Sequence, residues 1–149
     1  MLDIGLAYLH HLAVFAIVGL LFAEFVLIRP GLNGQQLTRL ARLDAAYGIS
    51  AILVILAGIA RVFLGSTGSA YYLSNHVFWT KMLLIVILGL LSIQPTLSII
   101  RWRRASGSDA NYLVPDADIK KARRFLHIEL FVLFLIPLAA AAMARGVGM

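Results

Sequence analysis

Four long apolar blocks set what this chain can fold into. They extend over residues 4–28, 43–64, 77–100 and 125–144, and polar segments separate them. A helix of about 20 residues crosses the roughly 30 Å hydrocarbon core of a bilayer. Only 13% of the 149 residues are charged, against about 25% in soluble domains. We therefore expect an all-α membrane protein with a single domain, residues 1–149, built as a four-transmembrane-helix bundle.

Proline and glycine mark where the apolar blocks end or bend. Arg29-Pro30-Gly31 follows the first block, and Gly65 to Ser69 follows the second. Pro95 and Pro137 lie inside the third and fourth blocks, where neighbouring helices have to satisfy the freed carbonyl groups. Residues 105–118 contain Ser, Gly and Asp, which predicts a solvated, flexible loop.

Basic residues predict how the bundle is oriented. Ten of the 13 Lys and Arg residues lie in or beside the loops that follow the first and third blocks, and three lie at the opposite end. Cytoplasmic loops are enriched in Lys and Arg, so we expect both termini outside the cytoplasm. The clusters at 101–104 and 120–124 also suit contact with anionic lipid headgroups. Topology and lipid explain the net charge of +6, and we expect no nucleic-acid partner.

The absence of cysteine narrows the chemistry. A chain with no Cys cannot form disulfides, thiolate metal sites, iron–sulfur clusters or covalently attached haem. A metal or cofactor would have to be held by His, carboxylate, Lys, Met or Tyr side chains.

Ionisable side chains inside apolar blocks are candidate functional residues, because placing them in hydrocarbon is costly. An outer group lies within about two helical turns of the boundary nearest the termini. Its members are His10, His11, Arg61, His76, Trp79 and Lys81. His10 and His11 are adjacent and point about 100° apart on a helix, so both cannot face one ligand. His10 shares a helix face with Glu24, and we expect it to face the bundle.

The presence of several of these side chains can also be explained without any function in binding or catalysis. Arg61 and Lys81 could extend to the headgroups, and His76 could be a histidine of a loop or helix cap.

An inner group lies nearer the basic loops. It contains Glu24, Asp44, Tyr47, His127 and Glu129. Arg29, Arg42 and Arg124 lie close enough in sequence to pair with its carboxylates. Such ion pairs would fasten helices together without any further function.

Haem b suits the outer group. Histidine can ligate haem iron, a four-helix core can enclose the ring, and Arg or Lys can pair with the propionates. His10 or His11 would be the axial ligand. His76 or Lys81 would be the second, or that position would stay open. A metal held by His10 and His76 is a related possibility.

Several motifs together resemble a family of small bacterial membrane proteins known only as a domain of unknown function. They are Tyr8-Leu9-His10-His11-Leu12, Arg42 to Gly48, Phe78-Trp79-Thr80-Lys81, and Glu129 with Ala142 to Gly146. The resemblance spans nearly the whole chain and implies a multi-pass protein of the bacterial inner membrane.

A more distant likeness links the chain to the HemJ-type protoporphyrinogen oxidases and the CopD-like copper-resistance proteins, which share a four-helix unit. In the HemJ-type enzymes, a histidine of the first helix and a lysine that follows an aromatic residue in the third accompany haem b. His10, Trp79 and Lys81 are similar to those positions. The doubled histidine, Arg61 and the last helix depart from the pattern. The likeness therefore implies haem binding and, more remotely, oxidase activity with a redox or small-molecule partner.

Three classes of function remain open at this point. The first is a membrane haem protein that acts as a redox enzyme or electron carrier. The second is a small ion or copper transporter that uses His10, His11 and Glu24. Because four helices are few for one transport path, it would be expected as a homodimer or trimer. The third is a structural protein whose ion pairs only hold helices together. Whether the chain is an enzyme is left open.

Overall fold

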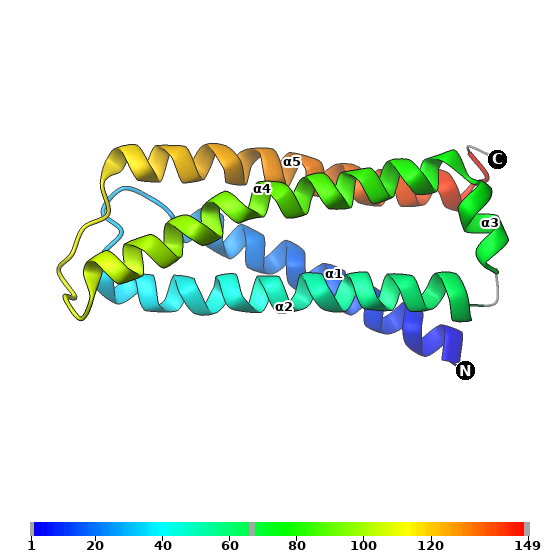
Figure 1. The fold of residues 1–149 in the computed structure, drawn as a ribbon, viewed down its shortest axis with the longest axis horizontal. Helices are drawn as coiled ribbons and strands as arrows, with labels where there is room; N and C mark the ends of the chain where they lie inside the picture. Colours follow the sequence, from blue (N-terminus) through cyan, green and yellow to red (C-terminus); the bar gives the residue numbers. More distant parts are fainter. Residues whose placement is uncertain (1, 66–67, 148–149) are drawn as a thin grey trace.

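A computed structural model describes residues 2–65 and 68–147, and this part of the chain is a bundle of helices (Figure 1). The long helices are α1 (Leu2–Leu27), α2 (Gly34–Leu64), α4 (His76–Ser106) and α5 (Asp116–Ala144), and the short α3 (Ser69–Ser74) connects α2 to α4. The prediction of an all-α fold is confirmed. The end of the bundle where α1 begins and α5 ends is called the terminal end below, and the opposite one the basic end.

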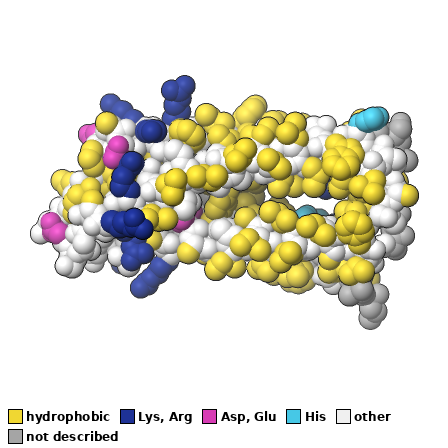
Figure 2. Space-filling model, in the orientation of Figure 1, with side chains coloured by type: hydrophobic (Ala, Val, Ile, Leu, Met, Phe, Trp, Pro, Cys, Tyr) yellow, Lys and Arg dark blue, Asp and Glu magenta, His cyan; other side chains and the backbone are white. Residues whose placement is uncertain are grey.

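The outside of the bundle is built to face lipid. Each of the four long helices contains a stretch long and apolar enough to cross a membrane. Large apolar side chains such as Phe15, Ile49, Leu90 and Phe131 are exposed. Leaving such a side chain in water forgoes about 1.5–3 kcal/mol of burial free energy. Apolar side chains cover most of the face in Figure 2, and Lys and Arg gather toward the basic end.

The helices form two antiparallel hairpins. Helix α1 packs along α2, and α4 packs along α5, whereas α2 with α4 and α1 with α5 meet over shorter stretches (Figure 1). The fully buried apolar side chains, including Leu21, Ile28, Leu40, Trp102 and Leu126, all lie in the basic half. Packing is therefore tighter in the basic half than in the terminal half.

Three helices are longer than the apolar blocks predict. Helix α2 begins at Gly34 instead of 43, α4 continues to Ser106 instead of 100, and α5 begins at Asp116 instead of 125. A helix can continue beyond the apolar stretch where its end is capped. Asn33 and Gln36 form a capping box at the start of α2, with hydrogen bonds of 3.0 and 3.2 Å.

Most of the segment predicted to be a solvated loop is exposed, but the part around Leu113 pairs with the α1–α2 connection. The Gly34 amide donates to the Tyr112 carbonyl at 2.9 Å, and the Val114 amide donates to the Leu32 carbonyl at 3.0 Å. Leu32 and Val114 are both buried. A Cβ at Gly34 would overlap the Asp109 carbonyl oxygen, so this close approach needs glycine.

Helix α3 closes the terminal end. The Asn75 side chain caps α4 by accepting from the Val77 amide at 2.8 Å, and it donates to the Val147 carbonyl at 3.3 Å. The Tyr71 hydroxyl donates to the Met143 carbonyl at 3.1 Å. These bonds hold the α3–α4 corner against the end of α5.

Candidate functional site

His10 faces the bundle and His11 faces outward, as their helix faces predict. The His10 ring lies against Gly58 of α2, where an added Cβ would be 3.6 Å from His10 Cε1. The Val54 carbonyl lies next to the ring, but His10 Nδ1 is buried and has no hydrogen-bond partner of good geometry among residues 2–65 and 68–147. His11 is exposed, and its Nδ1 is 2.6 Å from the Ala7 carbonyl oxygen of the same helix. Only His10 can therefore contribute to a site inside the bundle.

Arg61 of α2 and Lys81 of α4 lie close enough to His10 for their charges to act on it. Both are half-buried. Arg61 Nε is buried without a hydrogen-bond partner, and Lys81 Nζ is 5.4 Å from the centre of the Phe78 ring. His10, Arg61 and Lys81 together are called the terminal cluster. The cluster brings together one imidazole and two basic side chains from three helices. This combination suits a bound group that is anionic or that contains a metal which the imidazole can ligate.

The face between α2 and α4 is hollowed near the terminal cluster. Figure 2 shows this hollow in the half nearer the terminal end, with part of a histidine side chain visible inside it. The hollow agrees with the short contact between α2 and α4 and with the looser packing of the terminal half.

His76 and Trp79 do not join the terminal cluster, and His76 fits the alternative of a histidine at a helix cap. His76 is exposed at the first residue of α4. Trp79 is 54% exposed, and its Nε1 donates to the Leu73 carbonyl at 3.1 Å, which holds the indole against α3. Sequence position places both residues at the right depth but does not fix the direction in which they point. Over residues 2–65 and 68–147, no three His, Asp or Glu side chains converge as a metal site.

A second polar group lies in the basic half, where Glu24 of α1 and Glu129 of α5 are each 1% exposed. Asp44 and Tyr47 of α2 lie beside them. Glu24, Asp44 and Glu129 are near enough for their charges to interact, and the Tyr47 hydroxyl lies beside the Glu129 carboxyl group. Asp44 is half-buried and accepts a 2.6 Å hydrogen bond from the Thr96 hydroxyl of α4. Glu24, Asp44, Tyr47 and Glu129 are called the carboxyl cluster.

The expected ion pairs with loop arginines are not formed by the buried carboxyl oxygens. Glu24 Oε1 and both Glu129 oxygens have no hydrogen-bond partner within the described part of the chain. Arg29, Arg42 and Arg124 are exposed, since arginines at helix ends can stay hydrated. An unpaired buried carboxylate costs several kcal/mol, so these groups are either neutral or met by a cation.

His127 lies outside the carboxyl cluster, which corrects a second part of the prediction. It is exposed, its Nδ1 is 2.8 Å from the Arg123 carbonyl oxygen, and its ring meets the Phe25 ring edge-on with centres 4.6 Å apart. Arg123, considered in the sequence only as a loop cation, instead reaches back to the end of α1.

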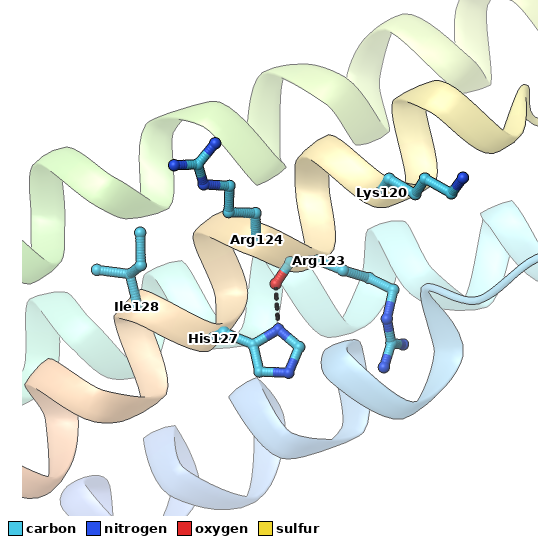
Figure 3. A pocket seen from close by; sticks show the side chains of 5 residues that line it. All are labelled: Lys120, Arg123, Arg124, His127 and Ile128. Atoms are coloured by element: carbon cyan, nitrogen blue, oxygen red, sulfur yellow. Dashed lines mark hydrogen bonds between the residues drawn. The ribbon is translucent and has the colours of Figure 1, made fainter.

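A shallow basic pocket covers this part of α5. Lys120, Arg123, Arg124, His127 and Ile128 line it, and Figure 3 shows Arg123 and His127 turned toward α1 while Arg124 points away. Lys120, Arg123 and Arg124 lie in the charged first part of α5, just before the apolar part of the helix begins. A phosphate at the membrane surface would find complementary charge here.

Gly58, Thr96 and Arg123 contribute contacts that the sequence analysis missed. The sequence contained a sign that Thr96 makes a contact inside the bundle, because it is a polar residue beside Pro95 within an apolar block. Nothing in the sequence indicates that Gly58 faces His10.

Comparison with known proteins places the chain in a family without assigning it an activity. No curated protein matches the chain, and no solved structure matches it. The family model described as "Predicted membrane protein (DUF2214)" matches residues 2–148, nearly the whole chain, and the protein therefore belongs to this family of membrane proteins.

Proposed function

We propose that this protein binds haem b in the hollow of its terminal half. The observation that carries the proposal is the terminal cluster. The buried His10 imidazole has a nitrogen without a hydrogen-bond partner in the described part of the chain, and it lies near Arg61 and Lys81 from two other helices.

The donor set fits the chemistry of haem. The His10 imidazole would hold the haem iron, and the Lys81 amine, once it has lost its proton, would be the candidate for a second ligand. Arg61 supplies a cation for a propionate, which would balance the positive charge of the cluster. Gly58 leaves the His10 ring free of a crowding side chain, and the loose packing of the terminal half suits a planar group.

The proposed role is electron transfer or oxidoreduction in a bacterial inner membrane, with both termini outside the cytoplasm. Haem iron, when bound, supplies one-electron chemistry. The likeness of His10, Trp79 and Lys81 to positions in HemJ-type enzymes supports this role by analogy alone.

A visible spectrum of the protein, purified in mild detergent, tests the proposal directly. Haem b would give a Soret band when oxidised and sharp α and β bands after dithionite reduction. We expect His10→Ala to lose most of the bound haem. His11→Ala is the matched control and should retain it, because His11 is exposed and bonded to its own helix. A preparation that stays colourless after addition of hemin would exclude haem binding.

Transport of a small ion or of copper is the second candidate function. The observation that favours it is a polar cluster in each half of the bundle, with Glu24 and Glu129 fully buried. A homodimer or trimer would be expected, since four helices leave little room for a pathway. Flux in proteoliposomes that is lost in Glu24→Gln would support transport, and unchanged flux would exclude this route.

A further inference from the structure

We propose that Glu24 and Glu129 form a proton-binding pair inside the bundle. This inference does not depend on haem, because the two residues lie in the basic half while the proposed haem site lies in the terminal half. It assigns the carboxyl cluster a ligand, the proton, and a chemical role as a proton store within the membrane.

The proposal rests first on the burial of the two carboxyl groups and on their lack of hydrogen-bond partners. Glu24 projects from α1 and Glu129 from α5, and each side chain is 1% exposed. Three of their four carboxyl oxygens have no hydrogen-bond partner of good geometry in the described part of the chain, although the Tyr47 hydroxyl lies close to the Glu129 carboxyl group. A charged carboxylate in such a place is strongly unfavourable.

The groups that face the pair add no positive charge. From α2, the neighbours are the Asp44 carboxyl group and the Tyr47 hydroxyl. From α4, the Thr96 hydroxyl is occupied by Asp44. From α5, Arg123 is occupied by carbonyl groups of α1, and His127 is exposed beyond Phe25. Because neighbouring carboxylates disfavour each other's charge, the arrangement favours retention of protons.

Proton binding fits this pair better than metal binding. No three His, Asp or Glu side chains converge as metal ligands among residues 2–65 and 68–147. Binding of a proton requires only one carboxyl oxygen and one hydrogen-bond acceptor, whereas a metal ion requires several ligands. Uptake forms an O–H bond on a carboxylate oxygen with a proton taken from water, and release returns that proton to water, so no other reactant is needed. Asp44 is half-buried whereas Glu24 and Glu129 are each 1% exposed, so exchange of the proton with water would pass by Asp44.

Infrared spectroscopy of the full-length protein in lipid tests the proposal. At neutral pH we expect a protonated-carboxyl C=O stretch that shifts in D₂O. Glu24→Gln and Glu129→Gln should each remove a large part of that band, since an amide keeps the shape of the side chain without the acid. Asp109→Asn is the control and should leave the band unchanged, because Asp109 is exposed.

The wild-type spectrum alone can overturn the proposal, so the test holds even if a variant fails to fold. A wild-type protein without a protonated-carboxyl band at neutral pH would show that both groups are ionised. A band of undiminished intensity in both variants would belong to other residues. Replacing choline by Na⁺ at constant pH should not alter the band. Its loss on Na⁺ addition would assign the site to Na⁺ and reject the proton. A colourless protein that still shows the band would remove the haem proposal and leave this one intact.

Discussion

Arg123 of α5 donates a 2.6 Å hydrogen bond from Nη1 to the carbonyl oxygen of Ile28, the residue that follows α1. The same nitrogen donates to the Phe25 carbonyl at 3.0 Å, and the guanidinium carbon is 4.3 Å from the centre of the Phe25 ring. The last carbonyls of a helix lack partners within it, and the helix dipole favours a cation there. Arg123 therefore caps α1 from α5, a helix that meets α1 over only a short stretch.

Loss of this cap should destabilise the bundle. We expect Arg123→Gln to lower the free energy of unfolding by about 1–3 kcal/mol, the usual effect of leaving buried hydrogen-bonding groups unpaired. Thermal unfolding in detergent measures this change. Arg124→Gln is the control, because Arg124 is exposed and should change stability by less than about 0.5 kcal/mol. Equal melting temperatures for the two variants would contradict the capping role.

The contact between the two loops of the basic end should tolerate no side chain at position 34. We expect Gly34→Ala to lower the melting temperature, because its Cβ would overlap the Asp109 carbonyl oxygen and push the paired backbones apart. Gly48→Ala is the matched substitution within the same helix, where a Cβ meets nothing within 4 Å. It should be neutral or stabilising, since alanine favours helix over glycine by about 1 kcal/mol. If Gly34→Ala is as stable as Gly48→Ala, the loops are not packed as described.

Two substitutions of Lys81 distinguish a ligand from a charge partner, on the proposal that haem is bound. Arginine keeps the positive charge but does not ligate iron under ordinary conditions. We therefore expect Lys81→Arg to retain haem with a shifted spectrum, and Lys81→Ala to retain less of it. Reduced-minus-oxidised spectra, normalised to haem content, provide the measurement. An unshifted spectrum in Lys81→Arg would limit Lys81 to a role as a counter-ion for a propionate.

Much of the fold was predictable because lipid imposes a simple rule on sequence. A helix that crosses a bilayer needs a long apolar stretch, so the four long helices could be located without other information. Helix ends were less predictable. The extension of α2 to Gly34 depends on the cap at Asn33, which lies well outside the apolar block.

The sequence predicted how deep in the membrane the site residues lie, but it predicted only partly the directions in which their side chains point. The three-and-four spacing correctly turned His10 inward, because α1 is a regular helix. The same reasoning could not show that Trp79 bonds to α3 or that His127 rests on Phe25, since those contacts depend on neighbouring helices. The alternative in which a loop arginine pairs with Glu24 could not be decided from the sequence for a similar reason, because closeness in sequence does not bring a hydrated arginine into the bundle.

The basic pocket on α5 should bind anionic phospholipid. We expect the double variant Lys120→Gln/Arg124→Gln to show roughly 30-fold weaker association with phosphatidylglycerol, because each cation near an anionic surface contributes about 1 kcal/mol. Quenching of the intrinsic Trp fluorescence by brominated lipid in mixed micelles measures the association. Phosphatidylcholine is the control lipid and should bind both proteins equally. Displacement by inorganic phosphate would show that the pocket recognises phosphate itself, and equal binding of both lipids would contradict the prediction.

The orientation proposed from the basic loops can be tested with single cysteines, because the natural chain contains none. Ser108 lies in the α4–α5 loop at the basic end, and Ala70 lies in α3 at the terminal end, and both are exposed. We expect a membrane-impermeant maleimide to label Ala70→Cys in intact spheroplasts and Ser108→Cys only after the membrane is opened, since basic loops stay in the cytoplasm. The reverse labelling pattern would show that the protein has the opposite orientation in the membrane. It would also place the carboxyl cluster near the outer surface, so that the proposed proton pair would exchange with the outside instead of the cytoplasm.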